Sequence, residues 1–408
     1  MSAASRLALA APPPSGAPDD VLALTEAYNA SGRQLFGEFA KKPGNIVFSP
    51  YSIGTVMAMA LSGARGATEQ EMAKVLRHSL TRAKMELASE ETIAILNETC
   101  AAAGQADETK CADPRQRSSN HLLVADALML PPTLGKFVSP NYIALLKDRY
   151  AAEVFKDATL KQINGWVSEK TEGKIPSLFN SFPAESVLVL INAIYFKAAW
   201  SFPFRKLSTT DGDFTTASNT RVSAPMMHKR EKFRWLKQPG YRAIRLPFAG
   251  LALGLIVVLP DATDGLDAVA RGLDYERQVQ LFEAIARRDE EPVALSLPKF
   301  KASFEGDLIG PFSDIGLKLA LSDKADFSGI ADRQVNIGGI VHKAVIELAE
   351  EGVEAAAATA ITVQTTSAPE QRPSEPFVVD RPFLFFVVDN RTGAVLFAGR
   401  IVDPTKAA

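Results

Sequence analysis

The side chains of this 408-residue chain that best suit metal binding or nucleophilic catalysis are few and scattered. No HExxH, CxxC or Cys/His cluster occurs, and neither a G-x-S-x-G elbow nor a phosphate-binding P-loop is present. We therefore predict no metal site and no cofactor. The four histidines and two cysteines are His78, His121, His228, His342, Cys100 and Cys111.

A serine hydrolase would need one of two serines to pair with a histidine. Ser49 and Ser52 could in principle combine with His342, but all three residues lie among apolar neighbours. Polar residues in such surroundings are usually buried and hydrogen-bonded rather than catalytic. The sequence therefore predicts that the protein is not an enzyme, and a hydrolase would require His342 to be accessible.

The composition is that of an ordinary globular protein, with 47% hydrophobic and 23% charged residues and a formal net charge of −2. No global basic field exists to hold nucleic acid or an anionic membrane, and no apolar stretch approaches the roughly 18 residues of a membrane span. We expect no nucleic-acid partner and no membrane partner.

The sequence does not determine the cellular compartment of the protein. The apolar run Leu7–Ala11 is shorter than the roughly 7–15 residues of a signal-peptide core, and the proline-rich residues after it predict a disordered lead-in over 1–19. Cys100 and Cys111 bracket a polar loop, and a disulfide and two free thiols are equally compatible with that spacing.

The elements that must position any site indicate a mixed α+β fold, helix-rich first and strand-rich later. We expect one domain over residues 20–404, because no linker or repeat divides the chain. A Thr68–Glu71 capping box is predicted to open the third helix. Helices are predicted over 20–39, 52–61, 68–76, a stretch ending at 97, 140–146 and 160–173. Strands are predicted over 45–49, 121–130, 187–196, 241–246, 251–259, 293–297, 341–348, 383–388 and 394–401.

The segment from Glu350 to Thr366 has an unusual composition, with four consecutive alanines followed by β-branched residues. Its alanines favour a helix, whereas its second half favours a strand. At a period of two, one face from Val353 to Thr365 is small or apolar apart from two threonines and could be buried. The residues from Ser367 to Pro376 are polar and proline-rich, which is typical of a protease-accessible tether. We interpret the segment as an exposed loop that can become a buried strand.

Dispersed motifs give the chain a strong resemblance to the serpin family of serine protease inhibitors over about residues 20–404. The resemblance implies three β-sheets, about nine helices and an exposed reactive loop at about 350–376. It also implies that a protease attacks the loop, and that the cleaved loop then inserts into the main sheet and traps the acyl-enzyme. The matching motifs are Asn45–Ile53, Gly63–Thr68, Thr171–Ile175, Leu190–Lys197 with Trp200, Leu297–Lys299, Val341–Ala344, Glu350–Gly352, Asp380–Phe383 and Phe397–Arg400.

The same resemblance assigns roles to particular residues. A shutter beneath the opening sheet would comprise Ser49, Ser52, Asn192 and His342, and a breach where the loop enters would comprise Trp200, Lys299 and Glu350. The loop hinge would comprise Glu350, Glu351, Gly352, Val353, Glu354, Ala355, Ala356, Ala357, Ala358 and Thr359. Val353 departs from the threonine or serine that inhibitory members often carry at the first inserting position.

The family's spacing of about seventeen residues from the first hinge glutamate places the cleaved bond at Thr366–Ser367. Thr366 would suit an elastase-like or subtilisin-like serine protease. Arg372 would suit a trypsin-like protease, but Pro373 would impede cleavage there. We expect a monomer in an extracellular or periplasmic location, with a cytoplasmic location still possible. The alternative is a non-inhibitory serpin that acts as a carrier, chaperone or storage protein.

Overall fold

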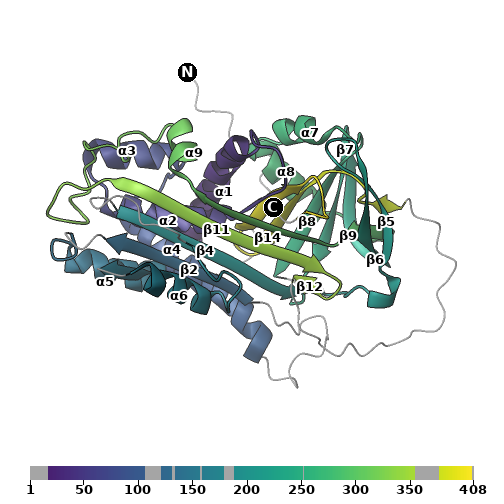
Figure 1. Ribbon diagram of the computed structural model, residues 1–408, viewed down its shortest axis with the longest axis horizontal. Helices are drawn as coiled ribbons and strands as arrows, with labels where there is room; N and C mark the ends of the chain where they lie inside the picture. The colour runs from purple at the N-terminus through teal and green to yellow at the C-terminus, as the bar shows by residue number, and fades with distance from the viewer. Residues whose placement is uncertain are drawn as a thin grey trace.

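The computed structural model describes residues 17–105, 121–130, 134–156, 159–178, 188–250, 252–353 and 376–406. Within these ranges helices pack against two β-sheets, and β11 crosses the molecule beside β4, with β2 on the far side of β4 (Figure 1). The nine α-helices of the described chain are α1 (Asp19–Phe39), α2 (Pro50–Gly63), α3 (Gly66–Val75), α4 (Arg82–Gln105), α5 (Pro140–Tyr150), α6 (Leu160–Lys170), α7 (Leu266–Gly272), α8 (Tyr275–Ala286) and α9 (Ile309–Asp314).

A six-stranded sheet has the order β10–β11–β12–β4–β2–β3. Its two long central strands, β4 and β11, run parallel and pair from Leu188 to Tyr195 on one strand and from Ile337 to Val345 on the other. β2 pairs antiparallel with β4, and β10 pairs antiparallel with β11. The strands are β2 (His121–Leu130), β3 (Glu153–Lys156), β4 (Leu188–Ala199), β10 (Phe300–Asp307), β11 (Ile337–Ala349) and β12 (Gly352–Val353).

A nine-stranded sheet has the order β1–β15–β14–β8–β7–β6–β9–β13, with β5 also on β6. The long strand β6 pairs with β7 at its end and with β9 and β5 earlier, so it divides this sheet into two parts. With the six-stranded sheet, these parts account for the three sheets expected. The strands are β1 (Ile46–Phe48), β5 (Thr210–Thr215), β6 (Arg221–Gln238), β7 (Tyr241–Pro247), β8 (Leu253–Pro260), β9 (Glu291–Pro298), β13 (Phe377–Val378), β14 (Phe383–Asp389) and β15 (Val395–Ile401).

Helix α2 is buried along its whole length, against α1 and between strands β4 and β15. It begins two residues before the predicted start, because Ser49 caps it: the Ser49 side chain accepts a hydrogen bond from the Ser52 N–H, and Pro50 occupies the first turn. The start of α2 therefore places both serines directly beneath the six-stranded sheet.

The predicted capping box of α3 is wrong. The helix begins at Gly66, two residues before Thr68, so Thr68 and Glu71 lie inside it. Thr68 Oγ1 instead accepts a hydrogen bond from the Asp326 N–H, and the Glu71 carboxylate accepts from the Leu319 and Ala320 N–H groups. The two side chains that the local pattern assigned to a helix cap thus bond instead to backbone groups far away in the sequence.

His78 follows α3 and lies edge-on to Tyr28 of α1, with the two ring centroids 5.7 Å apart. Both of its ring nitrogens are buried and have no hydrogen-bond partner among the described residues. Burial lowers the pKa of His78 to about 4, so the folded protein holds a neutral ring at neutral pH.

We expect the His78→Phe variant to be more acid-resistant than the wild type. An unfolded histidine takes up a proton near pH 6.5 and the folded one near pH 4, so stability is lost as the pH falls between these values. Phenylalanine keeps the edge-on ring contact but takes up no proton. Between pH 7.5 and 5 the variant should lose less stability than the wild type, by about 2 kcal/mol, as measured from urea unfolding midpoints.

The matched control is His228→Phe, because His228 is exposed in the folded protein. This control should leave the acid loss at the wild-type value. An equal acid loss in the wild type and His78→Phe would contradict the buried neutral histidine.

Candidate functional site

The candidate site is the seam between β4 and β11, where the chain re-enters its own sheet. After β11 the chain turns through Glu350 and Glu351, and the two residues of β12 lie between the ends of β11 and β4 (Figure 1). Val353 pairs antiparallel with Leu348 of β11 and with Ala198 of β4, and its side chain is fully buried. The first predicted inserting residue is therefore already a strand residue in this structure.

Gly352 has a conformation and a packing that another residue could not adopt. Its φ is +143°, and a Cβ atom at this position would lie 1.9 Å from the Ala198 carbonyl oxygen. A side chain would therefore collide with the backbone of β4. Glycine allows the chain to turn sharply into the seam.

A row of polar side chains crosses the sheet below β12. Register pairing places Asp126 of β2 beside Asn192 of β4, and Asn192 beside His342 of β11. The Asn192 amide donates hydrogen bonds to Asp126 Oδ1 and Ser52 Oγ, and Asn192 Oδ1 is hydrogen-bonded to His342 Nδ1. The structure thus brings Ser52, Asn192 and His342 together as the sequence predicted, and adds Asp126.

Ser49 completes the row through its backbone. The Ser49 N–H donates to His342 Nε2 at 3.2 Å, so Nε2 must be the unprotonated nitrogen, and Nδ1 donates to Asn192. Burial lowers the pKa of His342 to about 3, which keeps the ring neutral. His342 is fully buried, and neither serine hydroxyl contacts it among the described hydrogen bonds. The hydrolase hypothesis, which required an accessible His342, is wrong.

The predicted breach residues meet where the chain enters the seam. Glu350 forms an ion pair with Lys299 at 2.9 Å, and its other carboxylate oxygen accepts from Thr209 Oγ1 at 2.8 Å. Burial opposes the Glu350 charge, but the bonds from Lys299 and Thr209 outweigh it and hold the pKa of Glu350 below its usual range. The turn is thus held by a carboxylate that stays ionised.

Trp200 holds the same turn from the other side. Its indole Nε1 donates to the Ala349 carbonyl at 3.0 Å, and its backbone N–H donates to the Glu351 carbonyl at 2.9 Å. The Trp200 ring stacks on Phe248 with centroids 4.6 Å apart. Glu351 also pairs with Lys206 at 2.8 Å. The sequence did not single out Lys206 or Thr209, which lie in and directly after a single turn of 3-10 helix (Lys206–Ser208) without a motif.

The remaining loop residues that the sequence singled out lie outside the described residues. These are the later hinge residues and the predicted cleaved bond: Glu354, Ala355, Ala356, Ala357, Ala358, Thr359, Thr366 and Ser367. Among the residues that the structure describes, no group of three or more His, Cys, Asp or Glu side chains could hold a metal ion. No helix in these ranges has the length and apolar character to cross a membrane.

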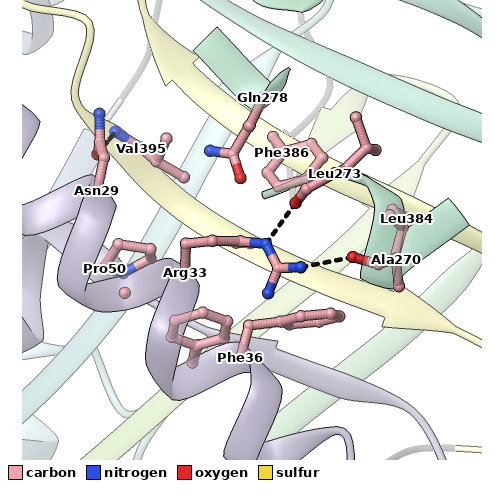
Figure 2. Close-up of a pocket in the computed structure, with 13 residues that line it drawn as sticks. Asn29, Arg33, Phe36, Pro50, Ala270, Leu273, Gln278, Leu384, Phe386 and Val395 are labelled. Carbon is pink, nitrogen blue, oxygen red and sulfur yellow. Dashed lines mark hydrogen bonds between the residues drawn. The ribbon is translucent and has the colours of Figure 1, made fainter. Parts of the chain in front are cut away.

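A small cavity lies between α1, β14, β15 and the α7–α8 junction (Figure 2). Its volume is about 20 Å³, room for about one water molecule. Arg33 crosses it and donates to the carbonyl oxygens of Leu273 and Ala270, both at 2.5 Å (Figure 2). Outside Arg33 an open groove of about 980 Å³ runs between α1 and the start of α8.

The fold and the seam define a mixed α+β protein whose chain re-enters the centre of its own main sheet. The chain belongs to the serpin family: the family model described as serpin (serine protease inhibitor) matches residues 26–404.

The relatives agree with this assignment. The chain is 32% identical to the leukocyte elastase inhibitor of Sus scrofa, over 88% of this chain and 93% of the relative. It is 31% identical to an uncharacterized serpin-like protein of Thermococcus kodakarensis, over 93% of this chain and 86% of the relative.

Two solved serpin-fold structures resemble it to a similar degree. An Arabidopsis serpin in its native stressed conformation matches with a TM-score of 0.79 and 27% identity, covering 96% of this chain and all of that one. Human thyroxine-binding globulin matches with a TM-score of 0.78 and 25% identity, covering 95% and 100%. The family therefore includes both protease inhibitors and carriers.

We expect Gly352→Ala to displace β12 from the seam, because its Cβ would collide with the Ala198 carbonyl. The variant should lose about 2–3 kcal/mol of stability, and the amides of β12 and of the adjoining ends of β4 and β11 should exchange faster with solvent. Hydrogen exchange measured by mass spectrometry checks this expectation.

Gly240→Ala is the matched control, since Gly240 also has a positive φ, of +88°, but a Cβ at this position would meet no atom within 4 Å. It carries the backbone strain without the collision, so exchange at β12 should stay at the wild-type rate. Unchanged hydrogen exchange at β12 in Gly352→Ala would contradict the pairing of β12 between β4 and β11.

Proposed function

We propose that the protein is a suicide-substrate inhibitor of serine proteases. A target protease cleaves the reactive loop, and the freed loop inserts between β4 and β11 before the acyl-enzyme can be hydrolysed. The observation that carries this proposal is β12: the seam already accepts Gly352 and Val353, which are paired on both sides. Insertion would extend a strand that has already begun.

The register of β12 fixes where later loop residues would arrive. Val353 lies opposite Ala198 and Leu348, so Thr359, six residues later, would lie opposite Asn192 on β4 and His342 on β11. The pairings with the two strands are consistent with each other, because Asn192 and His342 are themselves register partners. Thr359 would share the face of Val353, since residues an even number of positions apart point the same way.

Threonine is chemically suited to that position. When β4 and β11 part, Asn192 Oδ1 loses the His342 donor, and both groups would be left buried without a partner, at a cost of roughly 1–3 kcal/mol each. A hydroxyl can donate to one group and accept from another. Thr359 would therefore replace the Asn192–His342 bond in the inserted state, and the alanines Ala355 to Ala358 would occupy the strand positions before it.

We infer the type of target protease from the side chain next to the predicted cleaved bond. Thr366–Ser367 offers a small β-branched side chain, which an elastase-like or subtilisin-like protease would accept. The protein would act as a monomer, without catalytic activity of its own.

The carrier alternative would need a place for its cargo. The enclosed cavity at Arg33 is too small for one, because ligand pockets usually have about 300–1,000 Å³. A carrier would have to use the open groove between α1 and α8, whose rim includes Glu26, Arg33 and Arg77. The pairing of Gly352 and Val353 between β4 and β11 favours the inhibitor over the carrier.

The inhibitor proposal is tested by incubation with elastase-like, subtilisin-like and trypsin-like proteases, followed by a denaturing gel. A covalent complex with one of them is expected. Cleavage of the loop by several proteases without any covalent complex would exclude the inhibitory mechanism and leave the carrier.

We expect Ala357→Pro to convert the inhibitor into a substrate, because proline cannot donate a hydrogen bond within a central strand. Covalent complex should be lost while cleavage at the loop continues, as seen on the same gel. Ala357→Ser, which keeps the backbone N–H, is the control and should still form the complex. Complex formation by the proline variant would show that insertion is not required.

We expect Thr359→Val to shift the outcome from trapping toward cleavage. Valine keeps the shape of threonine but leaves Asn192 and His342 without a partner in the inserted state, which costs about 1–3 kcal/mol. The ratio of cleaved inhibitor to covalent complex should rise several-fold. Thr362→Val, whose side chain would face the other side of the sheet, is the control; an equal effect of both variants would contradict the proposed register.

A further inference from the structure

Asp126 is a buried carboxylate at the end of the polar row. It lies in the middle of the apolar strand β2 and is 7% exposed. Among the described residues it has no lysine or arginine partner, and Asn192 supplies the hydrogen bond to Oδ1. Such a group needs a reason to persist, because an unpaired buried charge is costly.

Three hydrogen bonds of the row run in one direction, from Ser49 to Asp126. The Ser49 N–H donates to His342 Nε2, His342 Nδ1 donates to Asn192 Oδ1, and the Asn192 amide donates to Asp126. A chain of donors that ends on a carboxylate is polarised along its length, and each bond strengthens the next. An ionised carboxylate accepts more strongly than a protonated one.

The bond between Asn192 and His342 is the side-chain bond of this row that crosses the seam. It must break when β4 and β11 part. The bond from Asn192 to Asp126 lies on the other side of β4 and is not crossed by the seam. The charge on Asp126 can therefore act on the seam without itself having to move.

The groups that face Asp126 keep the same charge near neutral pH, so Asp126 is the group whose protonation changes. Burial, and then the negative charge of Asp126, raise the pKa of Tyr51 of α2, so Tyr51 stays neutral. His342 of β11 is neutral above about pH 3, and Ser52 of α2 and Asn192 of β4 carry no charge. Burial raises the pKa of Asp126 to about 7, against the hydrogen bond from Asn192 that lowers it.

We propose that Asp126 is a proton-controlled latch on the seam: the ionised carboxylate strengthens the Asn192–His342 bond and slows opening, and its protonation speeds opening. The latch rests on the proposed opening of the seam, and it adds regulation by pH. In a mildly acidic medium the protein would accept a strand faster than in a mildly alkaline one.

The latch is tested without a protease, by using a peptide as the inserting strand. The peptide has the sequence of residues 353–366, acetylated and amidated, and its uptake by the intact protein is followed on a native gel from pH 5.5 to 8.5. For the wild type we expect uptake about threefold to tenfold faster at pH 5.5 than at pH 8.5, with one midpoint near neutral pH.

Asp126→Asn keeps the shape and an acceptor oxygen but cannot ionise. Its uptake should be independent of pH and should match the acid rate of the wild type. Asp126→Glu keeps the titration and should keep the pH dependence. Asp389→Asn, a buried carboxylate of the nine-stranded sheet with a raised pKa, is the control and should keep the wild-type profile.

The outcomes separate this latch from the proposed function. Peptide uptake that is flat with pH in the wild type would overturn the latch alone, even if the Asp126 variants do not fold. A pH dependence that survives in Asp126→Asn would also overturn it and would point to another titrating group, such as Lys229 of β6, whose pKa burial lowers to about 8. No uptake by the wild type at any pH would overturn the latch and the insertion mechanism together.

Discussion

The interaction on which the rest of the structure depends is the parallel pairing of β4 and β11 at the centre of one sheet. In the proposed mechanism these two strands must hold together and still be able to part. Backbone pairing and apolar packing alone would make β4 and β11 as permanent as any core strands. The seam instead carries a transverse row of side-chain hydrogen bonds from Asp126 to His342, which can be exchanged for other polar partners. The helix beneath the row, α2, supplies Ser49 and Ser52 because its first turn begins directly under β4.

The entry to the seam uses a different kind of interaction. Ionised Glu350, its partners Lys299 and Thr209, and the stacked Trp200 fix the turn from which β12 starts. Buried Glu350 is paired there with Lys299, whose side chain is 36% exposed, whereas the row inside the sheet consists of hydrogen bonds that end on Asp126. A buried charge with a cationic partner costs less than one without a partner.

The sequence could predict those parts of the fold in which local pattern and final environment agree. β4 is predicted as a central strand because it is apolar on both faces, and the structure buries nearly all of it. β6 escaped prediction because its charged residues point outward along a strand that serves two sheet parts, so no apolar run marks it. Asp126 escaped for the opposite reason, since a single acid within an apolar run carries no motif. The seating of β12 depends on pairing with two strands far away in the sequence, which no local pattern encodes.

The register of β12 has a consequence for how such a chain can change in length. In the proposed inserted state, the segment from Gly352 to Thr359 would act as a ruler that starts at a backbone position no side chain can occupy and ends at Asn192 and His342. A deletion or insertion of one residue in this stretch would turn every later side chain to the other face of the sheet. On this proposal, changes in length should be tolerated after the predicted cleaved bond Thr366–Ser367 and excluded between Gly352 and Thr359.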